Sequence, residues 1–504
     1  MDDNKINKIG SFLFLLLLFA GCAEKVPSDT SEQVDSDNDG FIDQFLNSAD
    51  AGSNYELDLE GIKERDTLKA ITTYSPTSYF LYRGRPMGYE YELAVRLAEY
   101  LDVELEMVVA RNIDGIFQLL NDGAGDVVMH NLTVTKVRKK YVDFTLPLNF
   151  THQVLVQRKP DNWRQMKLHE IDQELIRNPI HLIGKTIHVR ANSSYRERLL
   201  NLEEELGGDI DIQYLSGELS TSEIIEQVHV GEIEYTIADF NIAKINRSYF
   251  QDIDIETTVG VMTRLAWAVR KTSPQLLSEI NQWLKMERES SDYYVIYNRY
   301  FKNSRDYKKR VRSELYAPKS GKISEYDDLI KEAADRIGWD WRLLASQIYQ
   351  ESEFDPTEKS WAGATGLMQL MPRTAESYGF TRLGNPKINL DAGIAHLEYL
   401  HEYWEERVAD STERLKFILA SYNAGHNHVQ DARRIARMRG WDDNVWYENV
   451  ERAMLLKSKK RYFTMPEVKY GFCRGEEPVN YVQEILKRYQ YYTEFVDEAN
   501  RINT

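Results

Sequence analysis

The chain has 504 residues, of which 63 are Lys or Arg and 80 are Asp or Glu, so its formal net charge is −17. Hydrophobic residues make up 42% of the chain and aromatic residues 12%, which excludes a largely disordered protein and predicts more than one folded domain. The acidic balance argues against a nucleic-acid partner, and two cysteines cannot staple a disulfide-rich scaffold.

The N-terminus carries an apolar run at 12–20, which follows Lys5 and Lys8 and ends at Cys22. The run is too short to span a bilayer, and its basic start predicts an export signal. The sequence Phe-Ala-Gly-Cys resembles a bacterial lipobox. This resemblance implies a lipoprotein signal at 1–22 and acylation of Cys22, which would hold the protein on the periplasmic side of the outer membrane. An ordinary cleaved signal with an incidental cysteine is the alternative.

Residues 23–62 are polar and acidic, which predicts a flexible tether. Asp35, Asp37 and Asp39 alternate and precede Gly40, as in the first half of a calcium-binding loop. The bidentate Glu expected at the twelfth position is replaced by Leu46, so we expect an acidic linker here, with a calcium site as the alternative. We expect no resident metal and no cofactor.

The segment 63–300 alternates strand and helix patterns. Strands are expected at 68–72, 103–109, 126–129, 186–190, 210–214 and 235–238, and helices at 91–101, 113–120, 195–205 and 222–229. Strands that alternate with helices predict parallel sheets with covered faces. Two such α/β units in tandem predict two lobes with a ligand cleft between them.

Three stretches in this segment resemble the family 3 solute-binding proteins of the periplasm: GYEYEL, LTVTKVRKKYVDF and GKTIHVR. The resemblance implies a two-lobed periplasmic-binding-protein-like fold and an amino-acid, peptide or muropeptide ligand. It also implies that Arg138 grips the ligand's α-carboxylate and Asp239 its α-amine, while Thr133 and Ser194 complete the cradle. Bidentate Arg suits a carboxylate.

This segment also departs from the solute-binding pattern. Lys136 replaces a Pro, and Arg190 replaces a smaller residue. A retained fold without a free amino-acid ligand is therefore the alternative for this domain.

From residue 323 to residue 500 helical periodicity dominates, after a basic connector at 301–322. Helices are expected at 324–337, 341–352, 372–378, 389–408, 412–422, 427–438, 444–457 and 478–495. This pattern predicts an all-α domain.

One acid stands out in the helical domain. Asp340 can cap a helix in which Leu344, Ile348 and Glu351 share one face. A carboxyl group on an apolar stripe should have a raised pKa, which suits a general acid at neutral pH. The alternative is a helix-end Glu that reaches solvent.

Three ordered motifs surround this acid: Glu-Ser at 351–352, SWAGATGLMQLMP and ASYNAG. They resemble those of the lytic transglycosylases with a goose-type lysozyme-like fold. The resemblance implies cleavage of the β-1,4 bond between N-acetylmuramic acid and N-acetylglucosamine in peptidoglycan, with a 1,6-anhydro product. It implies that Glu351 is the catalytic acid/base. It places the substrate contacts at Ser352, Met368, Gln369, Tyr422 and Asn423.

An internal C6-hydroxyl nucleophile removes the need for the second carboxylate that ordinary glycosidases use. Near the C-terminus, the family pattern E-T-R-x-Y-V keeps Glu477, Tyr481 and Val482 but lacks its Arg. Two alternatives stay open: a non-catalytic sensor that binds murein, and a hydrolytic muramidase of the same fold.

Overall fold

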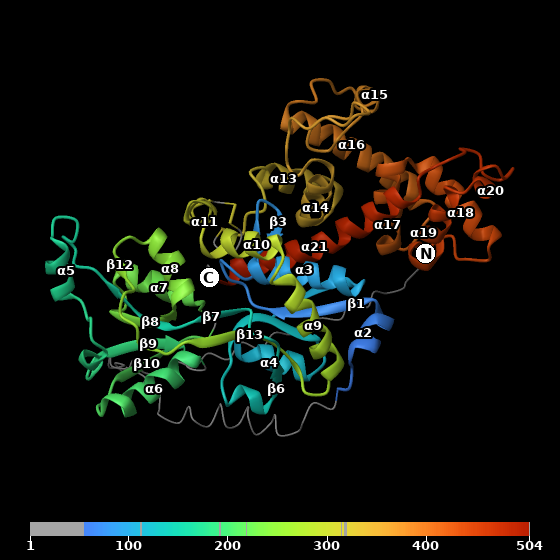
Figure 1. The fold of residues 1–504 in the computed structure, drawn as a ribbon. Helices are drawn as coiled ribbons and strands as arrows, with labels where there is room; N and C mark the ends of the chain where they lie inside the picture. The colour runs from blue at the N-terminus through green and yellow to red at the C-terminus, as the bar shows by residue number, and fades with distance from the viewer. Residues whose placement is uncertain are drawn as a thin grey trace, which may run out of the picture. The chain divides into compact units, whose positions relative to one another are not determined.

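A computed structural model of the chain describes residues 55–110, 113–190, 193–217, 219–313, 315–316 and 320–502 (Figure 1). The expected signal with Cys22 and the Asp-rich loop at 35–46 lie outside these residues. The chain from Ala51 to Thr504 forms one compact unit. No helix among the described residues is long and apolar enough to cross a membrane.

The first lobe is built on a six-stranded sheet. Its strands are β1 (Thr67–Thr72), β4 (Glu104–Val109), β5 (Val127–Thr133), β6 (Val142–Phe144), β7 (Asn149–Thr151) and β13 (Thr263–Arg270), in the order β4-β1-β5-β13-β6 with β7 beside β13. Successive side chains of a strand face opposite sides of the sheet. Val127 packs in the core formed with α3 (Tyr89–Leu101) and α9 (Pro274–Glu287). The next residue, Val128, packs on the other face, against α4 (Ile113–Asn121). Both faces of the sheet are therefore covered (Figure 1).

The second lobe has a five-stranded sheet in the order β10-β9-β11-β8-β12. Its strands are β8 (Gln153–Arg158), β9 (Thr186–Arg190), β10 (Asp211–Leu215), β11 (Tyr235–Asp239) and β12 (Ile253–Asp254). Its helices are α5 (Leu168–Glu174), α6 (Ser194–Leu206), α7 (Thr221–Val230) and α8 (Phe240–Tyr249).

The tandem pattern predicted two consecutive lobes, but the second lobe is inserted within the first. The chain leaves the first lobe after β7, builds the second lobe, and returns in β13, which runs antiparallel between β5 and β6. The first lobe's sheet is therefore mixed rather than parallel. Strand β13 escaped prediction because its run Leu265–Arg270 is buried on both faces and shows no alternation.

The helical domain begins with α13 (Asp327–Ile337) and α14 (Trp341–Ser352). Helices α15 (Pro372–Ser377), α16 (Pro386–Glu405), α17 (Ser411–Ala424), α18 (His426–Met438), α19 (Glu451–Lys457), α20 (Lys460–Phe463) and α21 (Glu476–Ile502) follow. The long helix α21 packs against α14 and α17. The helix expected at 444–457 is interrupted, because Tyr447 and Glu448 leave helical geometry, and Glu448 has a φ of 60°.

The two domains share one apolar core. Phe495 of α21 packs on Tyr74 and Tyr79 of the first lobe, with ring centroids 4.6 and 5.1 Å apart. The hairpin of β2 (Phe80–Tyr82) and β3 (Arg85–Met87) carries Gly84 at its tip. Tyr492 of α21 donates a hydrogen bond to the Gly84 carbonyl at 2.9 Å. First-lobe residues thus contact the last helix of the helical domain.

The ends of the solute-binding domain differ from expectation. Helix α2 (Leu59–Arg65) is ordered within the stretch expected to be tether, and Asp58 caps both α2 and the start of α9. Helix α10 (Ser291–Phe301) is followed by α11 (Ser304–Val311), which lies in the expected connector and packs on α8 of the second lobe. The described part of the connector is thus folded and contacts both lobes, because Tyr316 also forms a β-bridge with Tyr82 of the first lobe.

Candidate functional site

Glu351 stands in the last turn of α14. Asp340 accepts a hydrogen bond from the Arg342 amide at 2.9 Å and fixes the helix start. Leu344 and Ile348, on the same face, are fully buried, whereas Glu351 keeps partial exposure. Burial raises the pKa of Glu351 to about 8, and a hydrogen bond from Tyr481 opposes this rise. The acid therefore carries its proton at neutral pH, as general-acid catalysis requires.

Tyr481 is the residue that sequence reasoning passed over. Its hydroxyl donates to Oε1 of Glu351, and it accepts a hydrogen bond from Nε2 of Gln347 at 3.2 Å. Both Tyr481 and Gln347 are buried. The signal was present in the partial E-x-x-x-Y-V pattern, but only the packing of α21 on α14 brings this tyrosine to the acid.

The loop 365–371 lies against the end of α14. Ser352 is buried and donates to the Leu367 carbonyl at 2.8 Å, so it fastens this loop to the catalytic helix. The Met368 side chain is fully buried, and a Cβ on Gly393 of α16 would lie 2.1 Å from its sulfur. Lining of the sugar cleft and packing in the core were both open for the Met368 side chain, and the structure buries it in the core.

Gln369 has a φ of 46°, a conformation that non-glycine residues adopt rarely and often at functional sites. Its amide donates to the carbonyls of Glu358 at 3.1 Å and Gly366 at 3.0 Å. Gln369 therefore braces the loop that carries Met368.

Tyr422 and Asn423 end α17 beside this loop. Tyr422 donates to the Met368 carbonyl at 2.9 Å. Burial and the neighbouring Glu351 raise the pKa of Tyr422 well above its ordinary value, so its hydroxyl stays neutral near the acid. Asn423 is exposed.

The other nearby carboxylates do not share the site. Glu353 ends α14 in left-handed geometry, is exposed, and faces Arg85 at 3.9 Å. Asp355 bonds to the amide and hydroxyl of Thr357. Neither Glu353 nor Asp355 therefore contributes to the raised pKa of Glu351, which arises from burial.

A row of aromatic side chains extends along α16 from Tyr422. Its members, partly exposed and in mutual contact, are Tyr378, His396, Tyr399, Tyr403 and His426. The His396 ring lies 5.2 Å from that of Tyr422, and Tyr399 is 39% exposed. Burial lowers the pKa of His396 to about 4, so its ring is neutral. Partly exposed aromatic rings beside an acid provide an apolar surface on which a sugar ring can pack.

A second site lies in the cleft between the two lobes, where a cavity of about 370 Å³ opens. All four residues expected to hold a ligand line it: Thr133, Arg138, Ser194 and Asp239. Each of them lies at the carboxyl end of a strand or in the first turn of the helix that follows it. Open α/β sheets bind their ligands at this edge. Ser194 donates to Thr133 across the cleft at 3.3 Å, and Arg138 donates to the Thr133 carbonyl at 3.0 Å.

Asp239 is poised for a cationic group. It is buried, Tyr195 donates to its Oδ2 at 3.2 Å, and its Oδ1 has no hydrogen-bond partner among the described residues. Burial raises the pKa of Asp239 to about 6, against the opposing effects of Tyr195, Arg138 and Arg190.

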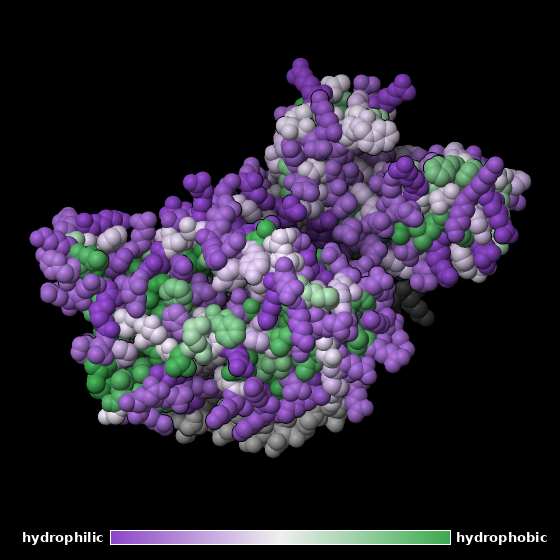
Figure 2. Space-filling model, in the orientation of Figure 1, coloured by the Kyte–Doolittle hydropathy of each residue, from purple (hydrophilic) through white to green (hydrophobic). Residues whose placement is uncertain are grey.

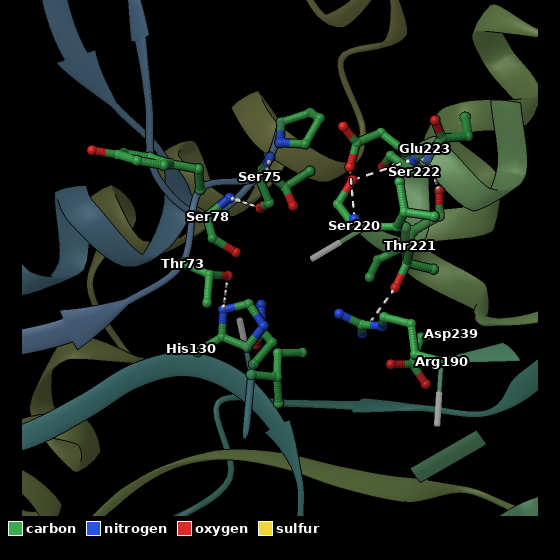
Figure 3. Close-up of a pocket in the computed structure, with 18 of the residues that line it drawn as sticks. Thr73, Ser75, Ser78, His130, Arg190, Ser220, Thr221, Ser222, Glu223 and Asp239 are labelled. Carbon is green, nitrogen blue, oxygen red and sulfur yellow. Dashed lines mark hydrogen bonds between the residues drawn. The ribbon is translucent and has the colours of Figure 1, made fainter. Parts of the chain in front are cut away.

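Two cleft residues were not anticipated as ligand contacts. His130 of β5 and Arg190 of β9 point into the cavity from opposite lobes (Figure 3). Burial and the two neighbouring arginines lower the pKa of His130 to about 3, so it is neutral. Arg190, which the sequence showed only as a departure from the solute-binding pattern, is a second cation in the cleft, and both it and Arg138 act on Asp239.

The connector closes one side of the cleft. Phe301, Tyr307 and Tyr316 line the cavity, and the Tyr307 hydroxyl donates to Asn246 of α8 at 3.2 Å. Glu226 of α7 lines the same cavity. The cleft therefore has cationic and acidic groups and an aromatic wall. Among the residues that the structure describes, no three His, Cys, Asp or Glu side chains are grouped to hold a metal ion.

Two family models match separate parts of the chain. Residues 68–303 match the bacterial extracellular solute-binding proteins, family 3, and residues 328–444 match the transglycosylase SLT domain. Among solved structures, the ancestral amino-acid-binding protein AncCDT-1, a precursor of cyclohexadienyl dehydratase, aligns with 25% identity and a TM-score of 0.41. That alignment covers 48% of this chain and 99% of that one.

Curated relatives match nearly the whole chain. Membrane-bound lytic murein transglycosylase F of Desulfosudis oleivorans is 37% identical over 433 residues, which cover 85% of this chain and 90% of that protein. The protein of the same name from Stutzerimonas stutzeri is 32% identical over 444 residues, 86% of each chain. The chain therefore belongs to the membrane-bound lytic murein transglycosylase F family, and it joins a solute-binding module to a lytic murein transglycosylase domain.

Proposed function

We propose that Glu351 alone performs acid and base catalysis in this lytic transglycosylase. The protonated carboxyl gives its proton to the glycosidic oxygen between N-acetylmuramic acid and N-acetylglucosamine. The carboxylate then takes the proton of the muramic C6 hydroxyl, which attacks C1 of the same sugar. The products are a free N-acetylglucosamine C4 hydroxyl and a 1,6-anhydro end, and no water is consumed.

The observation that carries this proposal is the isolation of Glu351. Its pKa of about 8 arises from burial, and no other carboxylate contributes to it. A hydrolase that retains or inverts configuration generally needs a second carboxylate about 5–10 Å away. The alternatives remain a hydrolytic muramidase and a murein-binding sensor.

Mass spectrometry of murein sacculi tests the proposal. Sacculi are incubated with residues 23–504, which contain every described residue, and in parallel with the Glu351→Gln variant. We expect anhydro-muropeptides with the wild type only. Reducing-end products would indicate a muramidase, and no products from either protein would favour the sensor.

We infer that the cleft of the solute-binding module takes a zwitterionic ligand, either an amino acid or a short stem peptide carried by a muropeptide. Arg138 and Arg190 provide cations for carboxylates, and Asp239 has an unpartnered Oδ1 for an amine. The cavity, at about 370 Å³, exceeds the volume of a small amino acid. A second carboxylate on the ligand would account for the second arginine.

Calorimetry distinguishes these ligands. Free amino acids and peptidoglycan stem peptides are titrated into the wild type and into Arg138→Gln and Asp239→Asn. We expect heat from a stem peptide, weakened in both variants. Arg196→Gln, on the outer face of α6 against Tyr214, is the control. Absence of heat with every ligand would favour a retained fold without a ligand.

We further propose that this module regulates catalysis. Loop 73–78 lines the ligand cleft, and its Tyr74 contacts Phe495 of α21. The same helix places Tyr481 on Glu351. Anhydro-muropeptide release, measured with and without the ligand that calorimetry identifies, tests this link, and an unchanged rate would reject it.

We also propose that the protein is periplasmic and held on the outer membrane by acyl chains on Cys22. Metabolic labelling with palmitate should tag the wild type but not Cys22→Ser. Equal labelling of both proteins would overturn the anchor.

A further inference from the structure

A basic and aromatic surface surrounds α20 of the catalytic domain. From Leu455 to Gly475 the chain has six basic residues and one acidic residue, although its net charge is −17. We call the exposed part of this segment the α20 patch. It consists of Lys459, Lys460, Arg461, Lys469, Tyr470 and Phe472.

The cations of the α20 patch face solvent. None of its four basic side chains forms an ion pair with another residue that the structure describes. The two other basic residues of the segment are engaged: Lys457 is buried on Asp431 at 2.7 Å, and Arg474 pairs with Glu477 at 3.0 Å. Unpaired cations concentrated in an acidic protein mark a surface with an anionic partner.

The aromatic members are exposed to an extent unusual for their size. Phe472 is 53% exposed and Tyr470 is 47% exposed. Figure 2 shows apolar surface among hydrophilic side chains at the end of the domain that carries α18 to α20. Phenyl and phenol rings next to lysines and arginines are the composition of surfaces that rest on a bilayer, with rings at the acyl boundary and cations at the headgroups.

The patch is held firmly in place. Phe472 packs edge-on against Phe463 of α20, with ring centroids 5.6 Å apart. The amides of Lys469 and Tyr470 donate to Asp431 at 2.9 and 2.8 Å. Because these contacts fix the backbone of both segments, the rings and the cations are presented on one surface, and binding has to order only the long basic side chains.

We propose that the α20 patch docks the catalytic domain on an anionic phospholipid surface. Phosphate headgroups match the four cations, and Phe472, which has no polar atom, gains by leaving water for the acyl boundary. Lysine stems can lie along the boundary while their ammonium groups reach the phosphates. Since the rest of the chain is acidic, such a membrane would attract this face and repel the others, which fixes the orientation of the domain.

Vesicle sedimentation tests the proposal. Residues 23–504, which lack the cysteine that could be acylated, are mixed with vesicles of phosphatidylglycerol and phosphatidylethanolamine, or of phosphatidylcholine alone. We expect binding to the anionic vesicles only, weakened by high salt because salt screens these charges. Binding to both vesicle types alike, or to neither, would overturn the proposal.

Matched variants locate the surface. Each basic residue near an anionic membrane strengthens binding about fivefold, so Lys459→Glu with Lys460→Glu should weaken it by about 25-fold or more. The control is Lys139→Glu with Lys140→Glu, an exposed pair in the first lobe with the same charge change. Phe472→Ser should also weaken binding, whereas Phe150→Ser, at a residue 60% exposed in β7, should not.

Thermal melting confirms that the variants are folded. Equal loss of vesicle binding in the α20 and control variants would reject this surface. A parallel sedimentation experiment with murein sacculi tests whether the anionic partner of the patch is peptidoglycan. If the lysine variant loses binding to sacculi but not to vesicles, the α20 patch serves the substrate and the membrane proposal fails.

Discussion

The hydroxyl of Tyr481 on α21 donates a hydrogen bond to Oε1 of Glu351 on α14, across 130 positions of the chain. Two opposing effects meet at this contact. Burial favours the protonated acid, and the phenol favours the carboxylate. In the proposed mechanism Glu351 first gives and then takes a proton, and Tyr481 lowers the free-energy difference between the two forms by stabilising the carboxylate.

Tyr481→Phe removes the donor and keeps the ring. We expect the pKa of Glu351 to rise further above about 8, so the alkaline limb of the rate profile moves to higher pH. A hydrogen bond to a charged group contributes about 1.5–3 kcal/mol, so kcat should fall about tenfold to a hundredfold. The control is Tyr489→Phe, on the same helix but bonded to Asp340 at 3.1 Å. If both variants give the wild-type profile, Tyr481 has no role in proton transfer.

Glu351→Gln should stabilise the fold while it abolishes activity. Between the ordinary pKa of 4.5 and about 8, the unfolded chain releases the Glu351 proton while the folded protein retains it. The wild type therefore loses stability as pH rises through this range, and glutamine does not titrate. Thermal unfolding should show that the variant has the larger free energy of unfolding, and that this difference grows with pH to about 1–3 kcal/mol. A gap that is constant with pH would contradict the raised pKa.

Gly84→Ala should loosen the contact between the domains. Gly84 has a φ of +72°, and an added Cβ would lie 2.6 Å from the Phe354 ring and 2.8 Å from the Tyr492 hydroxyl. Gly207→Ala is the matched control, because its φ is +69° and nothing lies within 4 Å. We expect urea unfolding to show about 1–3 kcal/mol more destabilisation at Gly84 than at Gly207. Equal effects would mean that backbone strain, and not the interface, sets the cost.

Tyr399→Ala tests the aromatic row along α16. If the row holds the glycan strand, KM for solubilised murein should rise about threefold to tenfold while kcat changes little, since a binding contact away from the bond is lost. Tyr399→Trp should restore KM. Tyr294→Ala, at an exposed tyrosine of α10, should leave KM unchanged. A fall in kcat with constant KM would assign Tyr399 a different role.

Much of the local structure followed from the sequence. Helix α14 spans the expected residues 341–352, because an Asp cap opens it and Pro356 follows soon after its end. Strand β9 likewise spans the expected 186–190, and the two-domain order is that of the motifs. Capping groups, side-chain periodicity and short motifs act over a few neighbouring residues, so they can be recognised from the sequence alone.

Other features depended on packing between distant segments. The return of the chain in β13, the insertion of the second lobe and the arrival of Arg190 in the same cleft as Arg138 arise from strand pairing, which no local pattern encodes. The Met368 side chain is buried because Gly393 leaves room for it on α16. The sequence by itself thus determined the two fold classes and their order, and it carried the motifs around Glu351. Only the tertiary structure decided that Tyr481 meets Glu351, because that contact exists once α21 buries its apolar face on α14.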